Sequence, residues 1–128
     1  MKILITGSNG LLGQKLVYAL KDDPEVELIA TARGENRLVS RDGYTFESMD
    51  ITNAENVMEI ICKHRPDRVI HGAAMTNVDA CETEKEACDL SNIDAVKHIV
   101  AASKKVGAHL THVSTDFIFD GVDGPYDE

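Results

Sequence analysis

Residues 3–13 read ILITGSNGLLG, and this stretch decides the fold. Its first three residues form a short apolar run before a glycine turn, which is typical of a strand buried on both faces of a parallel sheet. Glycines stand at positions 7, 10 and 13, and leucines at positions 12, 16 and 20 recur at helical spacing. This order of strand, turn and helix predicts a dinucleotide site with the pyrophosphate against the helix N-terminus. The alternative is that the glycines only make a turn.

Strands and helices alternate along the rest of the chain. Further strands are expected at residues 27–32, 44–49, 68–71 and 109–113. The alternation predicts an α/β fold, a Rossmann-like, doubly wound and mainly parallel sheet of about five strands. We treat residues 1–128 as one domain, because 128 residues that are 43% hydrophobic suffice for one core.

Two expected helices begin with the pattern of a capping box. Thr52 pairs with Glu55 in the first, and Thr83 pairs with Glu86 in the second. The second box opens the longest helix, and Gly107 is expected to cap its C-terminal end. The expected buried face of that helix carries Leu90, Ile93, Val96 and Val100.

Composition restricts the partners and the compartment. A formal net charge of −9 argues against a nucleic-acid or acidic membrane partner, because like charges repel. No apolar run approaches the roughly 18 residues of a membrane span, and the apolar start is too short for a signal peptide. The three cysteines Cys62, Cys81 and Cys88 indicate neither a disulfide framework nor a zinc site. We therefore expect a cytoplasmic protein with reduced cysteines.

The histidines do not suggest a metal site. None of the five falls at metal-ligand spacing, so no metal is predicted. His71 lies in an expected strand and is interpreted as a packed core residue. Cys81 and Cys88 are expected to share a helix face, but two thiolates do not complete a zinc site.

The end of the second expected strand bears on the choice of cofactor. An acidic residue there binds the ribose hydroxyls of NAD, whereas a basic residue pairs with the 2′-phosphate of NADP. This chain has Ala32 and Arg33 at that position, with Arg37 close behind. NADP(H) is therefore favoured over NAD(H), which stays the alternative. The other interpretation of Arg33 is a solvated arginine that pairs with Glu35.

Two further segments carry a resemblance to a known family. They read IHGAAMTNVD at residues 70–79 and VSTDFIFDG at residues 113–121. Together with the Gly-x-x-Gly-x-x-Gly turn, they closely resemble the dTDP-4-dehydrorhamnose reductase family of extended short-chain dehydrogenases/reductases. The resemblance implies NADPH-dependent hydride transfer to the C4 ketone of dTDP-4-dehydro-L-rhamnose, in dTDP-rhamnose biosynthesis. Two alternatives stay open: a non-catalytic dinucleotide-binding regulatory subunit resembling that of methionine adenosyltransferase, or another short-chain sugar-nucleotide epimerase or dehydratase.

The resemblance also implies cofactor-binding positions. The pyrophosphate would meet Gly7, Asn9, Gly10, Leu11 and Leu12, and Gly13 completes the cofactor-binding glycine turn. The adenine would meet Asp50 and Ile51, and the riboses and nicotinamide would meet Ala73, Ala74 and Thr76, with Asn92 behind them. Judged without the family, Asp50 is equally well a helix-entry carboxylate and Asn92 a solvated helix residue.

Thr115 matches the hydroxyl residue of the family's catalytic Ser/Thr-Tyr-Lys set. In that set the tyrosine protonates the carbonyl oxygen as hydride arrives, and the hydroxyl orients the carbonyl. Judged alone, Thr115 is also compatible with a turn hydroxyl. No Tyr-x-x-x-Lys occurs in these 128 residues. We therefore expect a Rossmann domain at 1–128 that is truncated before the catalytic helix and inactive alone. The expected partner of the longer protein is a nucleotide sugar, with homodimerisation left open.

Overall fold

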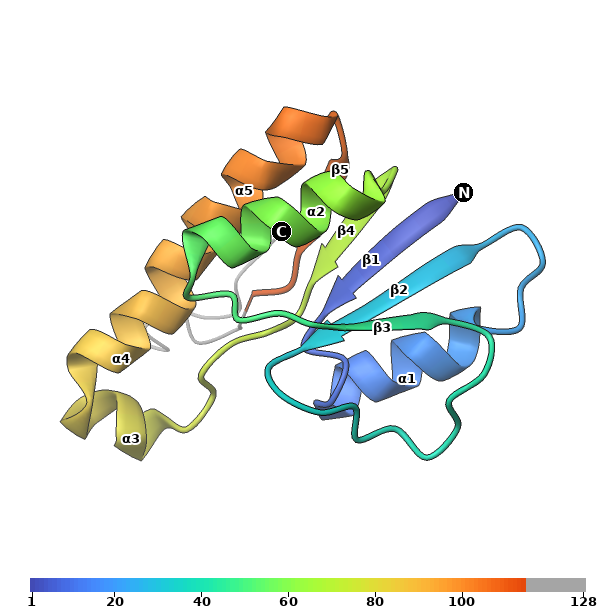
Figure 1. Ribbon diagram of the computed structural model, residues 1–128. Helices are drawn as coiled ribbons and strands as arrows, with labels where there is room; N and C mark the ends of the chain where they lie inside the picture. Colours follow the sequence, from blue (N-terminus) through green and yellow to red (C-terminus); the bar gives the residue numbers. More distant parts are fainter. Residues whose placement is uncertain (115–128) are drawn as a thin grey trace, which may run out of the picture.

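The computed structural model describes residues 1–114, which contain a parallel sheet with helices on both faces (Figure 1). The strands are β1 (Lys2–Thr6), β2 (Glu27–Ala32), β3 (Thr45–Ser48), β4 (Arg68–His71) and β5 (His109–His112). Their order within the described part is β3-β2-β1-β4-β5, and every neighbouring pair is parallel. The predicted Rossmann-like fold is confirmed, and the order reverses beside β1, where such sheets bind ligands.

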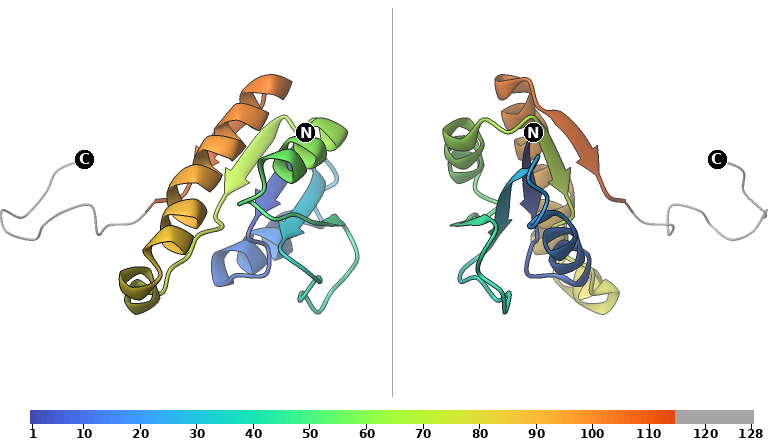
Figure 2. Two further views of the ribbon diagram at one scale, coloured as in Figure 1. Left: turned by 60° about the vertical axis from the view of Figure 1, so that its left-hand side comes forward. Right: turned by 90° about the vertical axis from the view of Figure 1, so that its right-hand side faces the viewer.

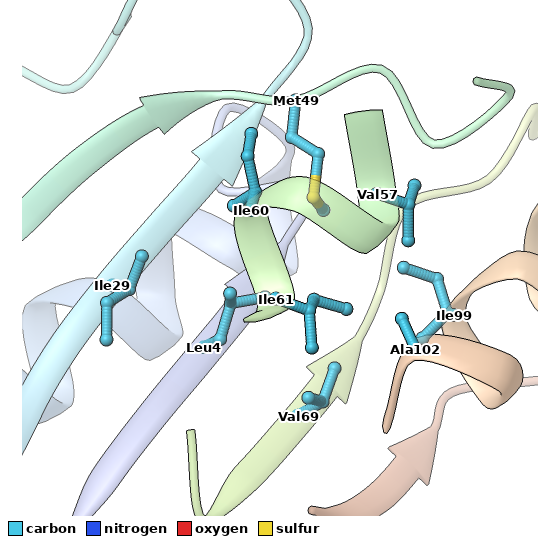
Figure 3. Packing of buried hydrophobic residues seen from close by; sticks show 9 residues of the cluster. All are labelled: Leu4, Ile29, Met49, Val57, Ile60, Ile61, Val69, Ile99 and Ala102. Carbon is cyan, nitrogen blue, oxygen red and sulfur yellow. The ribbon is translucent and has the colours of Figure 1, made fainter. Parts of the chain in front are cut away.

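Helices on the two faces of the sheet enclose two apolar clusters. Helix α1 (Leu11–Leu20) covers one face, where Val17 packs with Ile3 and Ile5. Helices α2 (Ala54–His64) and α5 (Ala95–Val106) cover the other face, as Figure 2 shows from two sides. Figure 3 shows the cluster beneath them, which consists of Leu4, Ile29, Met49, Val57, Ile60, Ile61, Val69, Ile99 and Ala102. Successive residues of β1 thus enter opposite clusters, as expected for a strand buried on both faces.

Both predicted capping boxes are wrong. The side chain of Asn53 caps α2 by accepting a hydrogen bond from the Asn56 N–H at 3.0 Å. The Thr52 hydroxyl is engaged elsewhere, because it donates to the Asp50 carboxylate at 2.7 Å. Thr83 is the last residue of a separate helix, α3 (Val78–Thr83), and its hydroxyl donates to carbonyls one turn back.

The long helix expected after residue 83 is interrupted. It consists of α4 (Lys85–Asp89), a π-helical turn η1 (Leu90–Asp94) and α5, which continue one another as one rod in Figure 2. Gly107 caps the end with a φ of 76°, as predicted. The predicted buried face is wrong for the two residues in the π turn, since Leu90 and Ile93 are 41% and 50% exposed, whereas Val96 and Val100 are half-buried. The residues buried in α5 are Ala95, Ile99, Ala102 and Ser103.

The expectation of reduced cysteines is wrong for one pair. A disulfide joins Cys81 of α3 to Cys88 of α4, with their Cα atoms 5.1 Å apart, while Cys62 is free. On one continuous helix, residues with this separation of 7 would stand about 10 Å apart along the axis. The chain instead breaks at Glu84, whose backbone is not helical, and the break brings the two sulfurs together.

A membrane-spanning helix needs about 20 mostly apolar residues. None of them, within residues 1–114, is long and apolar enough to cross a bilayer.

Candidate functional site

The glycine turn after β1 packs too tightly for side chains. Gly7 has a φ of +73°, and a Cβ added there would lie 2.9 Å from the backbone of Ala73. A Cβ on Gly13 would collide with the Gly7 carbonyl and lie 2.7 Å from the Cα of Ser8. These glycines therefore do more than turn the chain. The absence of side chains also lets α1 and the loop after β4 pack against the turn.

The N-terminus of α1 has no side-chain cap. Its N-cap is Gly10, which offers no side-chain acceptor, and its first turn has no acidic residue. Leu11, at the first helical position, is 82% exposed. Unsatisfied N–H groups and the positive end of the helix dipole therefore face open space, which fits the pyrophosphate of a dinucleotide.

A cleft of about 770 Å³ opens at the carboxyl ends of the strands, in front of this helix. Most residues implied by the resemblance line it: Gly7, Gly10, Leu11, Leu12, Gly13, Arg33, Asp50, Ile51, Ala73, Ala74 and Thr76. They follow four different strands, which the parallel sheet brings to one edge. The other two implied residues, Asn9 and Asn92, brace the cleft from behind its lining.

Asn9 ties the glycine turn to the loop after β2. Its side-chain oxygen accepts a hydrogen bond from the Arg37 N–H at 2.9 Å. Its side-chain N–H₂ group donates to the carbonyl of Glu35, also at 2.9 Å. The Asn9 carboxamide thus makes two of the hydrogen bonds that hold the loop carrying Arg33 and Arg37, and both of these arginines are exposed.

Asn92 ties the π turn to the loop after β4. Its carboxamide accepts from the N–H of Met75 at 2.8 Å and donates to the carbonyl of Met75 at 3.0 Å. Met75 itself lines the cleft. The alternative of a solvated Asn92 is wrong, since the side chain clamps the main chain of a cleft residue.

Asp50 is a helix-entry carboxylate at the edge of the cleft. It lines the cleft, and its carboxylate also receives the N–H and the hydroxyl of Thr52 at the entry to α2. The hydrogen bond from the Thr52 hydroxyl, with the nearby charge of Arg33, holds the pKa of Asp50 below its ordinary value. Within residues 1–114, Arg33 forms no ion pair with Glu35 or with another described residue.

A buried polar pair supports the cleft floor. Thr6 Oγ1 and His71 Nδ1 are 2.7 Å apart, and the N–H of Ala73 donates to the same hydroxyl at 3.2 Å. His71 is fully buried, as expected, and its ring stacks on that of His112 at 5.1 Å. Burial, with the charge of His112 beside it, lowers the pKa of His71 to about 4. His71 is therefore neutral at neutral pH and contributes to packing.

Several cleft residues were not among the predicted cofactor-binding positions. They are Thr31, Ala32, Met49, Thr52, Gly72, Met75, Glu84, Ala87 and Ser91. The first six lie at the ends of the expected strands or within four residues after them, so a search of the strand ends and the segments that follow them could have found them. Glu84, Ala87 and Ser91 reach the cleft only because the long helix is broken, which no local pattern indicated.

Thr115 lies outside the described residues, so its catalytic role stays a prediction. Metal ligands were sought as groups of at least three histidines, cysteines and carboxylates, and residues 1–114 contain no such group.

The sheet order and the glycine turn define a Rossmann-fold domain of the kind that reductases and epimerases share. The family is more specific. The chain belongs to the family described as the RmlD substrate binding domain, whose model matches residues 1–128.

Curated relatives cover the whole chain. The dTDP-4-dehydrorhamnose reductase of Aggregatibacter actinomycetemcomitans is 34% identical over 128 residues, which are 99% of this chain and 39% of the relative. The methionine adenosyltransferase 2 subunit beta of Bos taurus is 32% identical over 127 residues, which are 99% of this chain and 36% of the relative. The chain thus spans less than half the length of these relatives.

Solved structures agree with this assignment. A hypothetical dTDP-4-dehydrorhamnose reductase from Sulfolobus tokodaii is 39% identical and superposes with a TM-score of 0.85, covering 100% of this chain and 44% of that one. The dTDP-4-dehydrorhamnose reductase of Bacillus anthracis, solved in complex with NADP, is 31% identical with a TM-score of 0.74, covering 95% and 39%.

Proposed function

We propose that the protein is an NADPH-dependent reductase of dTDP-4-dehydro-L-rhamnose, and that residues 1–114 form most of its cofactor site. The observation that carries the proposal is the cleft of about 770 Å³ in front of the uncapped N-terminus of α1. Family membership and the relatives named as dTDP-4-dehydrorhamnose reductases support the substrate class, a nucleotide sugar. The Bacillus anthracis relative bound to NADP supports the cofactor.

Each wall of the cleft has a distinct role in this proposal. The turn at Gly7 and the first N–H groups of α1 hold the pyrophosphate. Asp50 and Ile51 border the adenine, and Arg33 pairs with the 2′-phosphate, with Arg37 near it on the same loop. The segment with Ala73, Ala74 and Thr76 borders the riboses and the nicotinamide, which supplies the hydride when NADPH is bound.

The chemistry needs groups beyond the cofactor cleft. Thr115 is proposed to orient the substrate carbonyl by donating a hydrogen bond to its oxygen. No Tyr-x-x-x-Lys occurs in the 128 residues, so we propose that 1–128 is a cofactor domain that lacks the proton donor and is inactive alone. A cytoplasmic location and a homodimer belong to the same proposal.

A reductase assay tests this function. The protein is mixed with dTDP-4-dehydrorhamnose and either NADPH or NADH, and the sugar nucleotide is followed by mass spectrometry. A catalytically complete protein is expected to convert the substrate to dTDP-rhamnose faster with NADPH, whereas the 128-residue chain is expected to bind NADPH without turnover. Conversion of a UDP-hexose to its C4 epimer, without net NADPH consumption, would instead indicate an epimerase.

A second candidate is a non-catalytic binding subunit, which the 32% identity to methionine adenosyltransferase 2 subunit beta favours. This candidate uses the same cleft but predicts no turnover of any sugar nucleotide. Co-purification with a methionine adenosyltransferase catalytic subunit, together with NADPH binding and no reductase activity in the complete protein, would support it over the reductase.

A further inference from the structure

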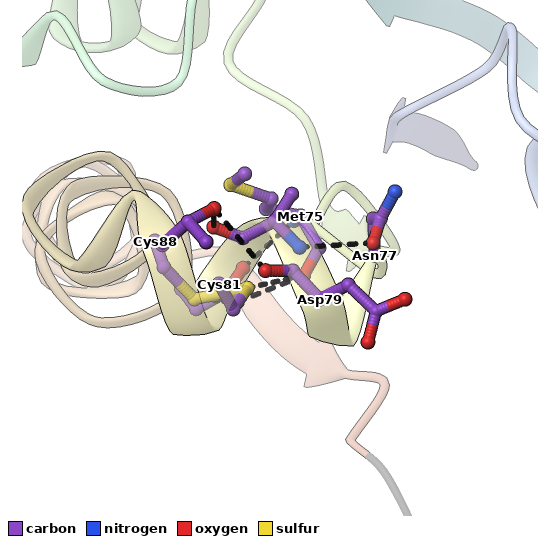
Figure 4. The surroundings of a disulfide bond; sticks show 8 residues. Met75, Asn77, Asp79, Cys81 and Cys88 are labelled. Carbon is purple, nitrogen blue, oxygen red and sulfur yellow. Dashed lines mark hydrogen bonds between the residues drawn. A yellow bond between two sulfur atoms is a disulfide. The ribbon is translucent and has the colours of Figure 1, made fainter.

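The disulfide lies directly behind the cleft wall. Figure 4 shows Cys81 and Cys88 beside Met75, which lines the cleft. Cys81 Sγ lies 3.7 Å from the Met75 carbonyl oxygen, and Cys88 Sγ accepts a hydrogen bond from the Asn92 side chain at 3.3 Å. Asn92 also clamps the main chain of Met75. The disulfide, the carboxamide and the cleft wall therefore form one connected unit.

The disulfide also encloses cleft residues. Glu84 and Ala87 lie between the two cysteines in the sequence, and both line the cleft. They belong to the junction between α3 and α4. Helix α3 has six residues and is too short to be stable alone, whereas α4 is the start of the long rod that continues through η1 and α5. No side chain caps the start of α4. The cross-link ties α3 to this rod and therefore adds order to the wall.

Both sulfurs belong to half-buried residues, so a small thiol reagent can approach them. A disulfide in an oxidising compartment is usually structural, whereas one in a reducing compartment is usually transient and redox-sensing. The position of this pair behind the cofactor cleft favours the second role.

We propose that Cys81 and Cys88 form a thiol–disulfide modification site whose oxidation state sets the affinity of the cleft for NADPH. The inference rests on the proposed function. The reductant is a dithiol: one of its thiolates attacks a protein sulfur and breaks the S–S bond, and its second thiol resolves the mixed disulfide. Two electrons and two protons reach the protein sulfurs, which end as two thiols, and the dithiol ends as a disulfide.

Reduction acts on Met75 in two ways. It releases α3 from α4, and it gives Cys81 an S–H group beside the carbonyl that Asn92 now holds. The release has the larger effect, because Cys88 Sγ accepts a hydrogen bond from Asn92 and is no longer fixed by the cross-link, so the clamp on Met75 weakens. We expect the oxidised protein to bind NADPH more tightly than the reduced protein.

Two measurements on oxidised and dithiothreitol-reduced protein test the proposal. Calorimetry is expected to show NADPH binding about fivefold weaker after reduction, at the lower end of ordinary allosteric coupling. Amide hydrogen exchange is expected to be faster at Met75 after reduction, because its N–H then loses a well-held acceptor. Thiol counting in denaturant, with one free thiol expected before reduction and three after it, verifies the two states.

Two variants separate the disulfide from general thiol effects. Cys88→Ala is expected to bind NADPH like the reduced wild type under both conditions. Cys62→Ala removes the free cysteine of α2 and is expected to respond to reduction as the wild type does. The exchange measurement on wild-type protein decides the matter even if Cys88→Ala folds poorly.

The outcomes distinguish this inference from the proposed function. Equal NADPH affinity and equal Met75 exchange in both states would overturn the inference and leave the cofactor site standing. A pair that does not oxidise with glutathione disulfide would overturn it as well. Absence of NADPH binding by folded protein in both states would overturn the cofactor site and the control of its affinity together.

Discussion

The side-chain oxygen of Asn9 accepts a hydrogen bond from the backbone N–H of Arg37 at 2.9 Å. This bond connects the turn proposed to hold the pyrophosphate with the loop proposed to hold the 2′-phosphate. The second bond of the carboxamide, to the Glu35 carbonyl, fixes the same loop. Asn9 therefore links recognition of two parts of the cofactor without lining the cleft itself.

Asn9→Ala is expected to weaken NADPH binding by up to about 30-fold, since two hydrogen bonds of roughly 1 kcal/mol each are lost from the loop. The turn backbone stays in place, so NADH binding, which needs no 2′-phosphate contact, is expected to change less than about twofold. Calorimetry with both cofactors measures the difference. A parallel loss for NADPH and NADH would show that Asn9 supports only the turn.

Arg33→Ala tests the 2′-phosphate contact directly. A hydrogen bond to a charged group contributes about 1.5–3 kcal/mol, so NADPH affinity is expected to fall about 10- to 100-fold. NADH affinity is expected to be unchanged. Lys15→Ala is the matched control, because it removes one positive charge from an exposed position of α1. Equal effects of the two variants on NADPH affinity would show that Arg33 acts only through its charge and makes no specific contact with the 2′-phosphate.

Gly13→Ala is expected to destabilise the domain although alanine is the better helix former. Helix propensity favours alanine by about 1 kcal/mol. The added Cβ, however, collides with the backbone of Gly7 and Ser8, which cannot rotate away as a side chain can. We expect the free energy of unfolding in urea to fall by about 2 kcal/mol or more, near the upper cost of overpacking.

Gly72→Ala provides the comparison for this variant. A Cβ there meets its nearest neighbour, the Thr6 carbonyl oxygen, at an ordinary 3.6 Å. Its effect on unfolding is expected to stay within about 1 kcal/mol. Similar losses for both variants would contradict the tight packing at Gly13.

The buried His71 makes stability depend on pH. Its pKa falls from 6.5 to about 4 on folding, so the unfolded chain binds more protons between these values. The contribution of His71 is therefore complete above pH 6.5 and is lost as the pH falls toward 4, by up to about 3 kcal/mol.

His71→Asn keeps a hydrogen-bonding group near Thr6 but cannot titrate. The variant is expected to lose less unfolding free energy than the wild type between pH 6.5 and 4, measured in urea. His109→Asn changes an exposed histidine and is expected to follow the wild type. Parallel pH profiles for His71→Asn and the wild type would disprove a depressed pKa in the folded state.

Local sequence patterns predicted the elements that rely on local forces. The apolar runs at β1, β2 and β4, and the glycine at position 107, appear where expected. The capping residues were mispredicted because Asp50 competes for the Thr52 hydroxyl, a contact that depends on how the chain enters α2. The exposure of Leu90 and Ile93 was mispredicted because a π turn leaves no clear periodic signature.

In the candidate site, too, the local features were predicted and the contacts between distant segments were not. The glycine turn was visible in the sequence because its spacing follows from the backbone geometry it must adopt. Asn9 and Asn92 were located by resemblance alone, and their bracing contacts depend on loops that are distant in sequence. The link between Cys81 and Cys88 was missed because it requires the break at Glu84, where no proline or glycine marks the end of a helix.

Titration calorimetry of the folded 128-residue chain with NADPH tests the central claim most directly. The account predicts saturable binding that Arg33→Ala weakens, with NADH binding more weakly than NADPH to the wild type. Folded chain that binds no NADPH even at millimolar concentration would contradict the assignment of the cleft at Gly7 as the cofactor site.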